Sequence, residues 1–272
     1  VTPEFGPDHN LNVVAGWNIE NYDYHRLGIL RQGLLSDLMP DFELMDGTET
    51  TLYDDGHSYG LVGFFGRANY TLLRRYIFEL SARCDGSSKF PVNQQWGFFP
   101  SASFGWRVSE EPWLKGAKGW LDNLKLRANA GSLGNGGVSP FAYLSTMGVS
   151  KSSIVFDGAL ANRVTDPSVI PDNLTWETVT TYDVGLDMDV LNSRLSFSGD
   201  YYIRNTTDLY VNGPEIPAIF GDNTPKGNYG ALQTRGWELT LSWRDSFKLG
   251  NKDFDYSIKG SLWDSRTFVT KY

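Results

Sequence analysis

The sequence has little of the residues on which disulfides, metal sites and helical membrane spans depend. It contains one cysteine, Cys84, which permits no internal disulfide, and only three histidines. It contains no run of 18 or more apolar residues, so we expect no transmembrane helix. The net charge is −8 and the basic residues form no cluster, which argues against nucleic-acid binding.

The three histidines also argue against an enzyme. His9, His25 and His57 are far apart and lie in or near predicted loops or strand ends. A metal or nucleophilic site would need a histidine to converge with a carboxylate or a serine. We therefore expect no catalytic residue, no metal ligand and no cofactor. Asp54 and Asp55 carry the oxygen ligands that calcium takes, but no EF-hand spacing accompanies them, so solvated loop acids are favoured.

Aromatic residues and glycine are abundant instead. Aromatics make up 14% of the chain, and there are 29 glycines, above the average usage of about 7%. Tyr and Trp suit a surface that is apolar at one end and wet at the other. No signal peptide precedes Val1, so we expect that a leader has been removed or that the sequence begins within a longer protein.

The clearest pattern runs from Leu174 to Val211 and predicts two long strands around a short turn at 191–194. Apolar and polar residues alternate on both sides of the turn, which places them on opposite faces of a strand. The apolar face holds Val184, Leu186, Met188, Val190, Leu195, Phe197, Tyr201 and Ile203, and the polar face holds Asp183, Asp187, Asp189, Ser196, Ser198, Asp200 and Arg204. Strands this long, with one oily and one charged face, are typical of a membrane-spanning β-barrel with lipid outside and a polar lumen inside.

The same alternation predicts about nine strands and an all-β, antiparallel fold. The remaining strands are expected at Leu11–Tyr24, Tyr59–Tyr70, Arg75–Asp85, Phe98–Val108, Leu124–Leu133, Gly230–Arg244 and Asp253–Arg266. Bacterial single-chain barrels usually have an even number of strands. We therefore expect a transmembrane β-barrel of which this chain is only part of the wall.

Long and short connections alternate along the chain, as they do in outer-membrane barrels with long extracellular loops and short periplasmic turns. We expect the long connections outside the cell, at Arg26–His57, Gly86–Gln95, Gly134–Asn173 and Asn212–Tyr229. Near the periplasmic rim we expect Arg74, Glu111, Asn192 and Lys248. Asp85–Ser88 is expected to form a strand-end turn, and Cys84 to face outward.

Several segments, in this order and spacing, resemble SusC/RagA-type TonB-dependent outer-membrane transporters of Bacteroidetes-like bacteria. The segments are FGRANY at 65–70, RCDGSSKF at 83–90, FPSAS, WR and SEE within 99–111, LDNLKLR at 121–127, GSLGN at 131–135, LTWET at 174–178 and GWEL at 236–239. They cover most of the chain, and the set is more specific than any single segment. Cys84, where the family often has a basic residue, and the polar GSLGN depart from the pattern.

The resemblance implies a barrel of roughly 22 strands that is closed by an N-terminal plug. Residues 1–272 would be a middle-to-late part of this wall, without the plug, the TonB-contacting segment and the last strands. It implies an outer-membrane importer of large nutrients, either glycans or oligopeptides, that is driven through the TonB complex. It also implies a SusD-like lipoprotein partner that covers the barrel as a lid.

Two sets of candidate site residues follow. The possible lumen-lining residues are Arg83, Arg107, Arg127, Asp183, Asp187, Asp200, Arg204 and Glu238. They could form a substrate path, but a hydrated wall in which the aspartates pair with Arg83, Arg107, Arg127 and Arg204 is favoured. The possible ligand or lid contacts in loops are Trp96, Tyr143, Phe220 and Tyr229. An interfacial aromatic girdle is the alternative role, and for Trp96 the two roles stay open.

Two other interpretations compete with a nutrient importer. The first is a soluble all-β carbohydrate-binding module, in which Trp237, Leu239 and Leu241 would pack against a second sheet. The second is a TonB-dependent receptor of the siderophore type.

Overall fold

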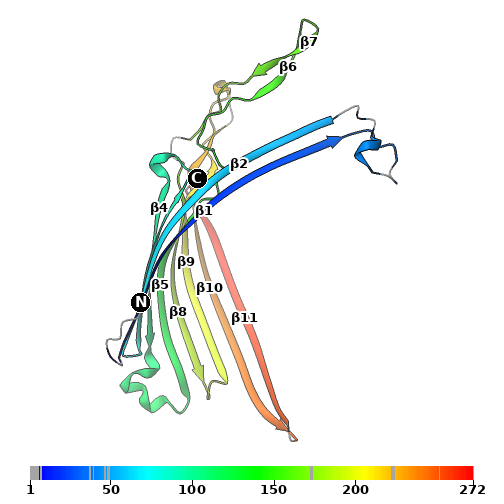
Figure 1. The fold of residues 1–272 in the computed structure, drawn as a ribbon. Coiled ribbons are helices and arrows are strands. Elements are labelled where there is room, and N and C mark those ends of the chain that lie inside the picture. The colour runs from blue at the N-terminus through cyan, green and yellow to red at the C-terminus, as the bar shows by residue number, and fades with distance from the viewer. Residues whose placement is uncertain are drawn as a thin grey trace.

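The computed structural model of the chain describes residues 6, 8–36, 38, 40–45, 47, 50–171, 174–221, 224–250 and 252–271. Over these residues, nine antiparallel strands form one curved sheet in the order β1-β2-β3-β4-β5-β8-β9-β10-β11 (Figure 1). The strands are β1 (His9–Arg31), β2 (Thr50–Leu72), β3 (Tyr76–Ser87), β4 (Trp96–Arg107), β5 (Leu121–Asn135), β8 (Glu177–Val190), β9 (Leu195–Asn212), β10 (Lys226–Leu249) and β11 (Lys252–Lys271). Neighbouring strands are neighbours in sequence, except where the β6–β7 hairpin is inserted.

The remaining elements are short and lie in connections. The hairpin of β6 (Val149–Phe156) and β7 (Ala159–Val164) projects beyond one end of the sheet (Figure 1). The 3-10 helices are η1 (Phe42–Leu44), η2 (Val92–Gln94), η3 (Val108–Glu110), η4 (Pro112–Ala117) and η5 (Ala218–Phe220). No helix in the described ranges has the length and apolar character needed to cross a membrane.

The prediction of nine long strands is confirmed, but the predicted loop Arg26–His57 is too long. β1 continues to Arg31 and β2 begins at Thr50. β3 pairs with β2 only from Leu61 onward, so the far ends of β1 and β2 form a two-stranded ribbon that extends away from the sheet (Figure 1). Both faces of such a ribbon contact solvent, and the alternation that reveals a half-buried strand is therefore lost there.

The register shows that the sheet has two different faces. One row of directly paired residues crosses β3 to β11 as Tyr76, Trp106, Leu126, Leu186, Gly199, Leu239 and Leu262. The adjacent row, on the opposite face, reads Gly105, Arg127, Gly185, Asp200, Glu238 and Trp263 from β4 to β11. We call these the apolar face and the polar face of the sheet.

The short connections lie at one end of the sheet, as predicted. Leu73 and Arg74 join β2 to β3 with φ of 52° and 56°, and Leu191, Asn192 and Ser193 join β8 to β9 with φ near 60°. The strand-end turn expected at Asp85–Ser88 begins later than predicted, because β3 continues through Ser87 and the turn starts at Ser88. Asp85 accepts a hydrogen bond from the Arg83 side chain rather than from its own backbone, and Gly86 has no positive φ.

Aromatic side chains border the apolar face at two levels. Trp96 stacks on Phe64 at one level, and Trp106 stacks on Tyr76 at the other, with centroid distances of 6.3 and 6.4 Å. The two tryptophans are ten residue positions apart on β4, which corresponds to about 26 Å along a membrane normal for a strand tilted by about 40°. The apolar band of an outer-membrane barrel is about 25 Å tall, so the spacing fits a membrane.

The competing soluble-module interpretation requires Trp237, Leu239 and Leu241 to pack against a second sheet, and the described residues show no such packing. Leu241 is 52% exposed and Leu239 is 39% exposed. The described residues contain only the nine-stranded sheet and the small β6–β7 hairpin. The apolar face is therefore uncovered, which a β-sandwich in water would not tolerate over so large an area.

Candidate functional site

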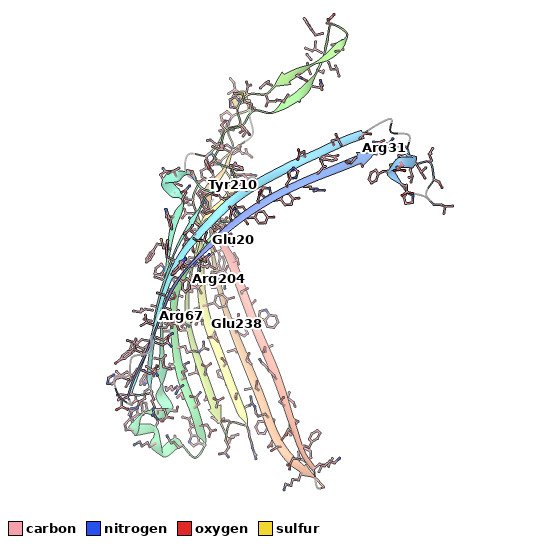
Figure 2. The ribbon with its side chains drawn as sticks, viewed as in Figure 1. Glu20, Arg31, Arg67, Arg204, Tyr210 and Glu238 are labelled. Carbon is pink, nitrogen blue, oxygen red and sulfur yellow. The ribbon has the colours of Figure 1, made fainter. Side chains whose placement is uncertain are left out.

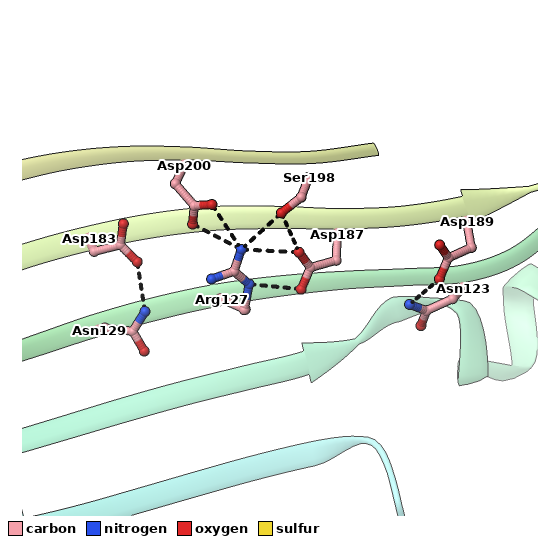
Figure 3. Close-up of polar contacts among 8 residues, drawn as sticks. All are labelled: Asn123, Arg127, Asn129, Asp183, Asp187, Asp189, Ser198 and Asp200. Atoms are coloured by element: carbon pink, nitrogen blue, oxygen red, sulfur yellow. Dashed lines mark hydrogen bonds and ion pairs between the residues drawn. The ribbon is translucent and has the colours of Figure 1, made fainter. Parts of the chain in front are cut away.

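The polar face carries a hydrogen-bonded network centred on Arg127 of β5 (Figure 3). Its Nε donates to Asp187 of β8 at 2.8 Å, and its Nη2 donates to Asp187 at 3.0 Å and to Asp200 of β9 at 3.1 Å. The Ser198 hydroxyl donates to Asp187 at 2.9 Å. All three charged side chains are partly buried, and one arginine thus joins three strands.

The other two aspartates on the polar face of β8 pair with amides. Asn129 donates to Asp183 at 2.7 Å and Asn123 donates to Asp189 at 3.1 Å, both between β5 and β8. The predicted pairing of these aspartates with four arginines is therefore confirmed only for Arg127. A carboxylate accepts equally from an amide directly opposite it, and the sequence alternation does not reveal which residue that is.

The other predicted arginines find different partners. Arg83 pairs with Asp85 of its own strand and donates to Asn18 of β1 at 2.9 Å. Arg204 lies over the ring of Tyr202, 5.6 Å from its centroid. Among the described residues, Arg107 forms no ion pair with an aspartate. It lines a polar recess of about 620 Å³ together with Lys125, Asp187, Asp189, Lys259 and neighbouring side chains.

Glu238 is exposed on the polar face of β10, directly opposite Asp200. Figure 2 shows Glu238 and Arg204 along the same part of the wall, Glu20 and Arg31 on β1, Arg67 on β2, and Tyr210 toward the far end of β9. The predicted lumen-lining residues all lie on strands of the sheet. They are distributed over β3, β4, β5, β8, β9 and β10 and do not converge on one catalytic-like cluster.

A compact apolar cluster lies where the long connections meet the sheet. We call it the rim cluster, and its buried members are Phe90, Phe99, Val138, Leu174 and Trp176. Phe90 and Leu174 have no exposed surface, in contrast to the open wall around them. The Trp176 indole donates to the Gln95 carbonyl at 2.9 Å. The cluster packs the chain at both ends of the long 136–173 connection, at Val138 and at Leu174, against Phe99 of β4 and Phe90 of the β3–β4 connection.

Two polar side chains complete the attachment. Buried Asn228 of β10 accepts from the Thr175 amide at 2.9 Å and donates to the Thr175 carbonyl at 3.0 Å, so it pairs with the segment as a strand would. Glu177 accepts from the Tyr210 amide at 2.9 Å and from Asn135 at 2.6 Å.

The alternation of apolar and polar residues does not reveal the rim cluster, because its members come from four separate connections and strands. The resemblance segments contain the signal, since Phe90, Phe99, Leu174, Trp176 and Glu177 all belong to them. These motif residues therefore have a structural role that explains them without a ligand.

The predicted loop aromatics divide into three cases. Trp96 lies on the apolar face beside Phe64 and opposite Gly86, in the position of a girdle residue. Tyr143 packs against the rim cluster, and the ring of Tyr229 covers Gly213 and Gly227 at the β9–β10 connection. The side chain of Phe220 lies outside the described residues.

At the opposite end of the sheet, Glu111 is a buried carboxylate with three donors. It accepts from the Tyr76 hydroxyl at 2.7 Å, the Trp106 indole at 3.0 Å and Arg75 Nη1 at 3.2 Å. The Tyr76 and Trp106 hydrogen bonds, with help from the Arg75 charge, lower the pKa of Glu111. The polar tips of two apolar-face aromatics thus converge on one anion at the end of the strands.

The histidines lie apart from one another. His9 shares a hydrogen bond with the Tyr70 hydroxyl at 2.8 Å, and His25 contacts Asp54 at 2.8 Å. The His57 ring contacts the rings of Tyr22 and Tyr24, with centroid distances of 5.9 and 4.9 Å. Within the described ranges, no group of three or more His, Cys, Asp and Glu side chains is placed to hold a metal ion.

Comparison with proteins of known structure finds the same sheet in other proteins. Two solved structures of RagAB, described as a peptide transporter and as a peptide importer in the closed-closed state, superpose with TM-scores of 0.82 and 0.83. They cover 99% and 100% of this chain, which corresponds to 29% of the RagAB chain in both cases, at 24% and 23% identity. This likeness shows a shared fold.

Relatives found by sequence have a higher sequence identity to this chain than the RagAB structures have. The chain is 35% identical to the TonB-dependent receptor SusC of Bacteroides thetaiotaomicron over 78% of its length, and 31% identical to the TonB-dependent receptor P3 of Formosa agariphila over 92% of its length. It spans 21% and 24% of these two relatives, so it corresponds to about a quarter of their length or less. The family model described as TonB dependent receptor-like, beta-barrel matches residues 2–271. The chain therefore belongs to the TonB-dependent receptor β-barrel family.

Proposed function

We propose that this chain is a section of an outer-membrane transporter that imports glycans or oligopeptides in a TonB-dependent manner. The apolar face contacts lipid, and the polar face lines the lumen, including Arg83, Arg107, Arg127, Asp183, Asp187, Asp200, Arg204 and Glu238. Transport involves no covalent chemistry on the cargo.

The observation that carries this proposal is the two-faced sheet. Its apolar face is uncovered over many strands and is bordered by aromatics at a spacing of about 26 Å, while its polar side chains bond to one another on the other face. The membership of the chain in the TonB-dependent receptor family and its likeness to SusC support import as the activity.

The long connections support a further part of the proposal. The rim cluster attaches the 136–173 connection, with its β6–β7 hairpin, at the end of the sheet opposite the short turns. We place this end outside the cell and assign a SusD-like lipoprotein lid to it. Contact with the TonB complex belongs to segments outside this chain.

Uptake by the bacterium tests the proposal. Deletion of the gene for the full-length protein should stop depletion from the medium of either a linear oligosaccharide mixture or a tryptic peptide mixture, and a wild-type copy should restore it. Growth on ferric siderophores should be unaffected. Unchanged depletion of both mixtures, with loss of siderophore-dependent growth, would instead support a siderophore receptor.

A further inference from the structure

Long side chains of the polar face lie across neighbouring strands, and they do so at glycines. Arg127 of β5 reaches Asp200 of β9 although β8 lies between them. At the crossing point β8 has Gly185, which pairs directly with both residues. A Cβ atom at this position would lie 2.8 Å from Arg127 Cζ and would also collide with the Asp200 carboxylate. Only glycine leaves room for this ion pair.

The same arrangement recurs on the polar face near the β1 edge of the sheet. Arg83 of β3 reaches Asn18 of β1 across β2, and β2 has the buried Gly63 at the crossing point. A Cβ at Gly63 would lie 2.7 Å from Arg83 Nη2 and would also meet the Asn18 and Asp85 side chains. A glycine on the intervening strand therefore allows each of the two arginines to lie flat against the sheet.

Three more glycines of the polar face lie beneath a long side chain from the adjacent strand. The distances from an added Cβ are 2.6 Å from Gly16 to Phe65 Cζ, 3.1 Å from Gly105 to Lys125 Cε, and 2.6 Å from Gly236 to Tyr202 Cζ. In strands, a glycine often marks a close approach by another group. Here the approaching group is a side chain that would otherwise project from the wall.

We propose that these glycines lower the relief of the polar face at the positions where long side chains such as Arg83 and Arg127 lie across it. They let charged and aromatic side chains lie along the wall, where they bond to the wall instead of to cargo. This inference rests on the proposed import function, because transport requires that cargo bind weakly enough to leave. Gly63 and Gly185 are then positioning residues for transport, acting through Arg83 and Arg127.

Gly63→Ala and Gly185→Ala in the full-length transporter test the proposal. Neither glycine has a positive φ, so alanine suits the backbone, and the atoms in its way belong to side-chain ends that can move. Gly66→Ala is the matched control, because Gly66 lies on the apolar face of the same strand as Gly63. The nearest atom to an added Cβ at Gly66 is 4.0 Å away.

Two measurements are made on each variant. The first is the rate at which an arginine-specific dicarbonyl reagent modifies Arg83 and Arg127, followed by peptide mass mapping of purified protein. We expect at least about a threefold increase for Arg83 in Gly63→Ala and for Arg127 in Gly185→Ala, because each loses charge-assisted hydrogen bonds. The second is uptake of the oligosaccharide and peptide mixtures per folded barrel, which should fall in both variants and stay unchanged in Gly66→Ala.

Unchanged arginine reactivity would overturn the proposed geometry. If arginine modification becomes faster but uptake per folded barrel stays at the wild-type level, the proposed role in transport is overturned. The glycines would then have only a structural role. If the wild-type protein imports neither mixture, the proposed function fails, and the reactivity measurement still decides whether the glycines hold the arginines flat.

Discussion

Glu111 shows how a single residue can set the response of the wall to pH. Its folded-state pKa is lowered by the Tyr76 and Trp106 hydrogen bonds. Such a carboxylate contributes stability that is present above its ordinary pKa near 4.5 and is lost as the pH falls through the lower folded-state value.

Glu111→Gln should therefore lower the stability of the protein at pH 7, and the difference from wild type should shrink as the pH falls below about 4.5. Urea unfolding in detergent across this pH range measures the effect. Glu110→Gln is the matched control, because Glu110 is half-exposed and forms only a 3.5 Å surface pair with Lys118. An equal effect of the two substitutions at all pH values would contradict this role for Glu111.

At the residue scale, the sequence predicts on which face of the sheet a side chain lies better than it predicts which side chain it bonds to. The polar-face positions of Arg127, Asp187 and Asp200 follow from alternation alone. Their mutual bonds depend on which residues stand opposite one another, and on Gly185 lying between them. The register of the sheet sets these features, and a single-strand pattern does not contain it.

At the scale of elements, the rim cluster holds the long 136–173 connection. Leu174 is fully buried there among Phe90, Phe99 and Trp176. Leu174→Ala should lower local stability by about 2–5 kcal/mol, the usual range for a buried leucine that leaves a cavity. The connection should then be cut faster by a protease under native conditions.

Leu160→Ala provides the comparison for this prediction, since Leu160 is in the same connection but is 47% exposed. Its cleavage rate should match that of wild type. Equal cleavage of the Leu174 and Leu160 variants would show that the rim cluster does not fasten the connection.

Strand positions were predictable because each strand has one apolar face. The ribbon formed by the ends of β1 and β2 was not, because residues such as Asp23, His25, Asp54 and Asp55 are exposed whichever way they point. For the same reason, the sequence indicates only Ser153–Phe156 as a short strand within the 134–173 connection, whereas the hairpin there comprises Val149–Phe156 and Ala159–Val164. Elements that bury neither face leave no period in the sequence.

At the scale of the whole molecule, the central claim is that one face of the sheet contacts lipid and the other contacts water. The sequence predicts this division, since alternation specifies the two faces of each strand. It does not predict how the rows align across nine strands, or that glycines let side chains cross between them. Both depend on long-range pairing.

The most direct test of the central claim compares Leu241→Arg with Thr240→Arg in folding titrations into lipid. The two residues are adjacent on β10; Leu241 lies on the apolar face, while Thr240 shares a hydrogen bond with Ser261 on the polar face. Leu241→Arg should destabilise the folded barrel by about 2–4 kcal/mol if it lies near the membrane midplane, and Thr240→Arg should cost much less. Equal costs for the two substitutions, or a larger cost for Thr240→Arg, would contradict a wall with lipid on one side and water on the other.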